Sequence, residues 1–307
     1  MTPVEHMIRL LSAMKKTEIR LIPGESRGDL PVGTSKLLGL PDVPPSFVWP
    51  RFEGEDPNHV RADRPLRFLC QIDLSALASL GVDDPLPKTG ILSFFYDTGS
   101  MRGGVDPADE GCSRVYWFPD RDELSPREPP EDLPDLGFRG ALPLEFVPHD
   151  SYPAYDDFCE YPEENEILPT IPPGTLWKVY ADAVSALGYG DDGDLRHKLL
   201  GWPDTEGEAM PYQCEAVSRG IYMGDGSGMD RLTREERIGI AETGRDEWIS
   251  LLQLDSIEDG NTALIWEDPD SADELKPGWI PCGRLWFFIR KADLAARRFE
   301  EVWLIFQ

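Results

Sequence analysis

The chain has 307 residues, 57 acidic and 30 basic, and therefore a formal net charge of -27. This length allows one large or two modest hydrophobic cores, and a hydrophobic content of 40% is typical of a folded globular protein. The excess negative charge argues against binding to nucleic acid or anionic membranes, which are themselves negatively charged. It is compatible with a merely soluble acidic surface, with a basic protein partner or with a salt-adapted host.

Residues 1–17 predict an amphipathic helix. Thr2 can cap it, Pro3 suits the first helical position, and Glu5 completes a capping box. One face would carry the apolar residues Val4, Met7, Ile8, Leu11 and Met14. Because this segment lacks the basic and apolar blocks of a secretory signal, we expect a cytoplasmic protein.

Strands dominate the remaining strong signals. Apolar and aromatic runs predict strands within residues 66–73, 90–97, 113–120, 247–255, 283–290 and 301–307. Helices are expected at 74–80 and at 232–242. The acidic, proline-rich stretch 119–137 disfavours both kinds of element and predicts a long surface loop.

Three sequence patterns occur twice, in the same order. The copies are KLLGLPD (Lys36–Asp42) and KLLGWPD (Lys198–Asp204), FLCQID (Phe68–Asp73) and SLLQLD (Ser250–Asp255), and TGILSFFYD (Thr89–Asp97) and CGRLWFFIRK (Cys282–Lys291). The unequal spacings require insertions in the second copy, which loops accommodate at a small entropic cost. We therefore expect an α+β fold of two fused, pseudo-repeated β-rich halves with peripheral helices. The expected single domain, 1–307, comprises an N-terminal helix (1–17), a first repeat (18–160) and a second repeat (161–307).

The cysteines indicate neither a metal site nor a disulfide framework. Five are present, at Cys70, Cys112, Cys159, Cys214 and Cys282, with no CxxC pair among them. We expect reduced, mostly packed thiols and no cofactor. Apolar runs reach only about six residues, far short of the roughly 20 that cross a bilayer.

The order of these motifs resembles the bacterial YwqG-like family, also known as domain of unknown function 1963. The matching residues are Leu38–Pro41, Trp49–Pro50, Phe68–Leu74, Gly90–Asp97, His197–Pro203, Leu251–Ser256, Gly283–Ile289 and Phe299–Gln307. This family has no established reaction. It is distantly similar to eukaryotic programmed-cell-death-2-like proteins, some of which are chaperones for a basic ribosomal protein, and other relatives have been suggested as toxin-immunity proteins. The resemblance thus implies protein binding, although the cysteine pairs of the eukaryotic relatives are missing here.

Four polar residues are candidate binding groups: Gln71, Asp73, Gln253 and Asp255. Residues two apart on a strand point to the same face, so each Gln and Asp pair could grip an extended peptide backbone in a groove. The alternative is that they satisfy buried backbone groups at strand ends and cap the next turn.

Two further places are candidates. Phe47 and Trp49 lie in a proline-rich turn, where aromatic residues serve either as a contact surface or as the lid of a core. His197 has no HxH or HExxH partner, which favours a structural hydrogen bond over a catalytic or metal-binding role.

Two motif matches are rejected. GYGDDG (188–193) fits GxGxxG formally, but its aspartates would repel a pyrophosphate and no βαβ pattern surrounds it. The loop from Asp225 to Glu236 lacks the glycine that a calcium loop needs at its sixth position, where Asp230 stands.

The expected function is a cytoplasmic protein-binding module, chaperone-like or toxin-immunity-like, for a basic partner protein. The alternative is an enzyme or small-ligand-binding protein with its site in the cleft between the two halves. In that case Asp73 and Asp255 would serve as acid and base. No motif names a reaction, so we identify no catalytic residue.

Overall fold

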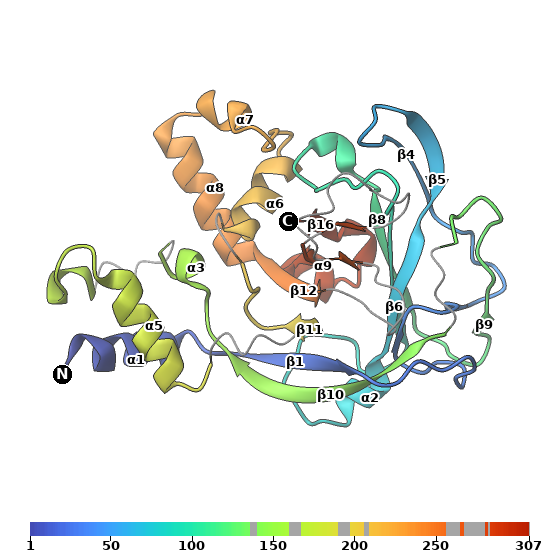
Figure 1. The fold of residues 1–307 in the computed structure, drawn as a ribbon, viewed down its shortest axis with the longest axis horizontal. Helices are drawn as coiled ribbons and strands as arrows, with labels where there is room; N and C mark the ends of the chain where they lie inside the picture. The colour runs from blue at the N-terminus through green and yellow to red at the C-terminus, as the bar shows by residue number, and fades with distance from the viewer. Residues whose placement is uncertain are drawn as a thin grey trace.

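The computed structural model describes residues 1–135, 140–159, 167–189, 197–205, 209–255, 265–266, 280–281 and 283–306. A ten-stranded sheet runs through the molecule, and helices gather at one end and along one side of it (Figure 1). The predicted mixture of helices and strands is confirmed.

Every neighbouring pair in the large sheet is antiparallel. In spatial order its strands are β16 (Trp303–Phe306), β15 (Leu285–Arg290), β12 (Trp248–Leu254), β11 (His197–Leu200), β1 (Lys16–Pro23), β10 (Leu142–Ser151), β2 (Lys36–Leu37), β6 (Arg67–Asp73), β7 (Ile91–Tyr96) and β8 (Ser113–Phe118). The six strands predicted from apolar and aromatic runs are confirmed. The central pair, β1 and β10, was not predicted.

The strands on either side of the central pair, β1 and β10, form two wings of the sheet. The sheet is bent so that these two wings face one another. The register shifts by one residue between Phe68 and Cys70 on β6, and again between Ser250 and Leu252 on β12. Such bulges bend a strand and increase its twist. Apolar side chains of both wings meet in one large core, which includes the centre strand residues Ile19 and Leu21.

Two tight turns connect strands to the loops beside the sheet centre. Leu38 and Gly39 both have positive φ, at 57° and 74°, and Leu200 and Gly201 repeat these values at 58° and 75°. Both copies of the LLGxPD motif therefore contain a left-handed glycine. A Cβ on Gly201 would lie 2.7 Å from the Cβ of Glu18, so only glycine fits that close approach.

The remaining elements surround the sheet. The helices are α1 (Pro3–Ala13), α2 (Leu74–Ala78), α3 (Tyr155–Cys159), α5 (Leu176–Ala186), α6 (Met210–Ser218), α7 (Ser227–Asp230), α8 (Arg234–Glu247) and α9 (Lys291–Ala295), with short turns η1 (Pro107–Asp109), η2 (Leu168–Thr170) and η3 (Phe299–Glu301). Three two-stranded pairs are β3 (Asp42–Val43) with β9 (Ser125–Pro126), β4 (Arg51–Glu55) with β5 (Arg61–Pro65), and β13 (Ile265–Trp266) with β14 (Ile280–Pro281). Within 119–135, the predicted loop contains only the short strand β9.

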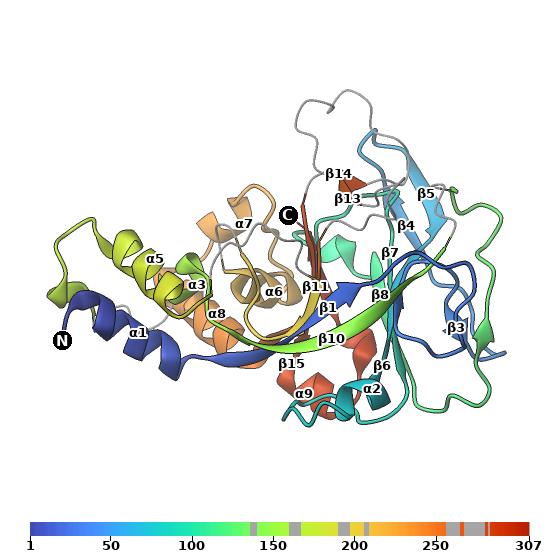
Figure 2. The ribbon, with the colours of Figure 1, turned by 60° about the horizontal axis from the view of Figure 1, so that its bottom comes forward.

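Helices α1, α3 and α5 form a lobe at one end of the molecule, and the N terminus lies at its tip (Figure 2). The lobe has a core of its own, in which Leu11 and Phe158 are fully buried. The predicted capping box of Thr2 and Glu5 is confirmed. The helix is shorter than the predicted 1–17, because it ends at Ala13 and the chain continues directly into β1.

The described cysteines are free thiols, and three of the four are buried; Cys282 lies outside the described residues. No helix within the described ranges is long and apolar enough to span a bilayer.

Candidate functional site

The predicted residue Gln71 belongs to a buried polar network in the first half of the chain. Its amide nitrogen donates to Asp42 Oδ2 at 2.6 Å, and its amide oxygen accepts from the backbone nitrogen of Asp42 at 2.9 Å. Lys36 forms an ion pair with the same carboxylate at 3.0 Å. The three side chains are nearly inaccessible to solvent. Gln71 therefore holds the LLGxPD turn against the sheet.

Gln253 makes the corresponding contacts in the second half. It donates to Asp204 Oδ2 at 2.8 Å and accepts from the Asp204 backbone at 2.9 Å, while Lys198 pairs with Oδ1 at 2.8 Å. Here Lys198 also contacts Glu18 of β1, at 3.0 Å. The first network has Ala141 near its glycine, where the second has Glu18.

The predicted aspartates lie where their strands end, and each pairs with an arginine. Asp73 caps α2 through the backbone nitrogen of Ser75 and contacts Arg121 at 2.7 Å. Asp255 contacts Arg284 at 2.9 Å. Paired carboxylates of this kind are typical of strand-end caps, and they would have to leave their arginines to act as acid and base.

His197 is a buried acceptor. Its Nδ1 accepts from the backbone nitrogen of Asp255 at 3.1 Å, so the ring proton is on Nε2. Burial lowers the pKa of His197 to about 4, although the nearby Asp255 charge opposes this shift. In the first half of the chain, Ser35 Oγ accepts the equivalent hydrogen bond, from the backbone nitrogen of Asp73 at 2.7 Å. His197 thus has the position of a structural residue.

Phe47 and Trp49 pack against the main core. The Phe47 ring stacks on Phe95 at 5.7 Å, and the Trp49 indole donates to the Leu66 carbonyl at 2.8 Å. Val48 between them is 81% exposed. The turn therefore presents an aliphatic side chain, rather than its aromatic pair, to solvent.

Residues of the rejected calcium-loop match have local structural roles. Asp225 accepts from the backbone of Ser227 at the start of α7, and Glu236 forms a capping box with Thr233 on α8. No group of potential metal ligands occurs among the residues with described positions. Residues 190–193 of the GYGDDG match lie outside those ranges.

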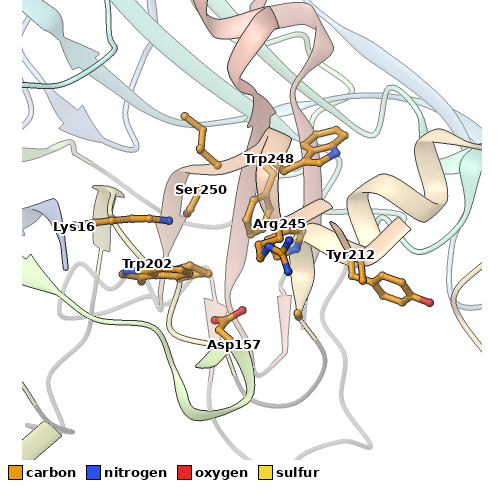
Figure 3. Close-up of a pocket in the computed structure, with 14 residues that line it drawn as sticks. Lys16, Asp157, Trp202, Tyr212, Arg245, Trp248 and Ser250 are labelled. Carbon is orange, nitrogen blue, oxygen red and sulfur yellow. The ribbon is translucent and has the colours of Figure 1, made fainter. Parts of the chain in front are cut away.

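A recess lined by charged and aromatic side chains lies where the helical lobe meets the second half of the sheet (Figure 3). It is formed by Lys16 of β1, Asp157 of α3, Trp202 after β11 and Arg245 of α8, and its free volume is about 40 Å³. The Lys16 ammonium lies 3.5 Å from the centre of the Trp202 ring. Two larger cavities, of about 480 and 590 Å³, lie beside Arg67 and His149.

None of these three cavities of the described chain is lined by Gln71, Asp73, Gln253 or Asp255. The residues that line the recess come from distant segments of the chain, which the sequence patterns did not connect. One signal was visible: Trp202 occupies the variable position of the second LLGxPD copy, where the first copy has Leu40.

A second unpredicted feature is an aromatic cluster on the helical lobe. Trp177 is 59% exposed, although its ring contacts Tyr155 at 4.9 Å and stacks on Tyr180 at 5.8 Å. Burial raises the pKa of Tyr180, and the charges of Asp157 and Asp156 raise it further. The cluster therefore lies in negatively charged surroundings.

A family model described as "Domain of unknown function (DUF1963)" matches residues 35–307. The chain belongs to the DUF1963 family. The match includes both LLGxPD turns, both QxD strands and both paired-phenylalanine strands, so the predicted family is confirmed. A comparison with curated proteins found no match. The YwqG-like assignment and the distant likeness to programmed-cell-death-2-like proteins stay predictions.

Proposed function

We propose that this DUF1963 protein is a binding module that docks a basic segment of a partner protein on the Trp177 face of its helical lobe. The Trp177 face consists of Trp177 and Tyr155, with Asp156 beside them. The observation that carries the proposal is the 59% exposure of Trp177 in a cluster of aromatic rings. Tryptophan is highly buried on average, and it is among the residues most enriched at binding hot spots.

The chemistry of the face favours a basic occupant. Lysine and arginine cations bind over the faces of tryptophan and tyrosine rings, and nearby carboxylates strengthen the attraction. Asp156 and Asp157 act on the cluster electrostatically, as the raised pKa of Tyr180 indicates. Lys178 on the same helix has a carboxylate beside it, since it forms an ion pair with Asp182 at 2.8 Å.

The net charge of the whole molecule also favours a positively charged partner. A net charge of -27 attracts a basic protein over distances comparable to the Debye length, and accelerates its association at low salt. We propose that the protein sequesters such a partner in the cytoplasm, in a chaperone-like or immunity-like manner.

We further propose that the sheet consists of two copies of one ancestral unit. In its support, Lys36 pairs with Gln71 in register, as Lys198 pairs with Gln253. The bulges on β6 and β12 fall at matching positions, and the two left-handed turns have nearly equal φ values. This duplication would explain why the same polar network is built twice.

Capture from a bacterial lysate at low ionic strength tests the function, with wild type, Trp177→Ala and Ile238→Ala as baits. Ile238 is an exposed residue of α8, 47% accessible, and serves as the matched control. A captured protein is then purified, and a peptide of its most basic segment is titrated against each bait.

We expect wild type and Ile238→Ala to bind the peptide equally. Trp177→Ala should bind at least about 30-fold more weakly, as loss of a hot-spot residue does. Affinity should also fall as salt is raised. The proposal fails if no captured protein depends on Trp177, or if the dependent protein binds through an acidic segment.

A further inference from the structure

The recess at Lys16 differs in charge from the rest of the molecule. Lys16 and Arg245 line it, and Lys291 is close enough to Lys16 to affect its titration. Two carboxylates, Asp157 and Asp246, accompany these three cations. In a chain with nearly twice as many acids as bases, this recess therefore has a positive balance.

The ammonium of Lys16 is the group in this recess that is open to a ligand. Over the residues whose positions are described, it has neither an ion pair nor a hydrogen bond, and its contact is with the Trp202 ring. The lysine as a whole retains access to solvent, while the protein around its ammonium is dense enough for burial to lower the pKa of this group. An unpaired ammonium enclosed by protein gains more from a bound anion than a freely hydrated surface lysine does.

The other walls of the recess are held rigidly. The Trp202 indole donates to the Met14 carbonyl at 2.8 Å, and its backbone nitrogen donates to Ser151 Oγ at 3.1 Å. Asp157 Oδ2 accepts from Thr205 Oγ1 at 2.9 Å. Figure 3 shows Lys16 extending over the flat Trp202 ring, with Asp157 and Arg245 on other sides of the space. A preorganised site of this kind loses little entropy when it binds a ligand.

We propose that this recess is a binding site for a carboxylate group, which pairs with the Lys16 ammonium above the Trp202 ring. A free volume of about 40 Å³ is enough for a carboxylate group but too small to enclose the rest of a large ligand, which would lie outside the recess. The group belongs either to a small free carboxylate or to the C terminus of a peptide. The site is distinct from the Trp177 face, and its proposal does not depend on the proposed function.

Calorimetric titration of the full-length protein tests this site with two kinds of probe. One is sodium acetate, with sodium chloride at equal ionic strength as its reference. The other is a short glycine-rich peptide with a free C terminus, compared with the same peptide as its C-terminal amide. The proteins are wild type, Lys16→Met and Lys178→Met, of which the last removes an exposed lysine that does not line the recess.

We expect saturable binding of a carboxylate probe by wild type and Lys178→Met, and binding at least about tenfold weaker by Lys16→Met, because a charge-assisted hydrogen bond is lost. Binding of acetate alone would indicate a small free ligand. Tighter binding of the acid than of the amide peptide would indicate a C terminus. The proposal is overturned if neither probe binds wild type saturably, or if Lys16→Met binds as well as wild type. Matching circular dichroism spectra would establish that all three proteins are folded.

Discussion

The ring of Phe94 on β7 contacts the ring of Phe287 on β15 edge to face, with their centroids 5.2 Å apart. These strands lie near opposite ends of the ten-stranded sheet, so the contact joins its two wings through the core. At this contact the two wings of the curved sheet pack against each other in the core.

Phe94→Leu and Phe287→Leu should each lower the free energy of unfolding by about 1–2 kcal/mol, since both rings are fully buried. The double variant should reveal a coupling of about 0.5–1.5 kcal/mol, as expected for an aromatic pair. Urea titration of wild type, the two single variants and the double variant measures this coupling. Val48→Ala, at an exposed site, should change stability by less than about 0.5 kcal/mol. Strict additivity of the two phenylalanine substitutions would contradict the contact.

Gln253→Leu should lower the free energy of unfolding by about 2–4 kcal/mol, because it leaves the backbone of Asp204 and the Trp286 indole without an acceptor. Gln71→Leu should cost less, since the only buried N–H group that it leaves without this acceptor is the Asp42 backbone, although Asp42 Oδ2 and the Thr34 carbonyl each lose a donor. Asn58→Leu replaces an exposed amide and is the control. Equal stabilities of wild type and Gln253→Leu in urea titration would show that the network contributes nothing.

His197 should make the protein sensitive to acid. Its pKa is about 4 in the folded state and near 6.5 when unfolded, so the folded state favours the neutral ring. The resulting stability is fully present above pH 6.5 and is lost as pH falls toward 4, by about 3 kcal/mol in total. His197→Asn keeps an acceptor for Asp255 but does not titrate, so its stability should fall less over this range.

Urea titrations at several values of pH measure that difference. His59→Asn, at an exposed histidine, should follow wild type throughout. Parallel curves for wild type and His197→Asn between pH 6.5 and 4 would indicate that the buried ring is not kept neutral.

Lys15 and Lys16 should differ in reactivity, although they are adjacent in sequence. Burial lowers the pKa of Lys16 to about 8, with Lys291 adding to the shift and Asp157 opposing it. A hydrogen bond to Asp150 raises the pKa of Lys15. At pH 7.5 the neutral amine should therefore be at least about 100-fold more abundant at Lys16.

A limiting amount of an amine-reactive ester, followed by peptide mapping with mass spectrometry, should find Lys16 modified at least about tenfold faster than Lys15. Lys16→Met removes the fast-reacting site and identifies it. Equal labelling of the two lysines would place the Lys16 ammonium in ordinary solvent.

The amino-acid sequence by itself determined the local features of this protein. The capping box of Thr2 and Glu5 forms between residues three apart, and at the start of α2 the backbone N–H of Ser75 donates to the carboxylate of its near neighbour Asp73. The outer strands are rich in apolar and aromatic residues, so their composition alone predicted them. The repeated motifs also placed the chain in its family.

Only the tertiary structure decided which distant segments meet. Strand β1 pairs with β10, more than a hundred residues away, and Lys16 contacts Trp202, which follows the other neighbour of β1, strand β11. Arg121 and Arg284 each pair with an aspartate that lies in a different sequence motif. Such contacts depend on the curvature of the sheet and the paths of its loops. A pattern of neighbouring residues contains no signal for either, because each long-range contact becomes favourable only when the rest of the core has formed.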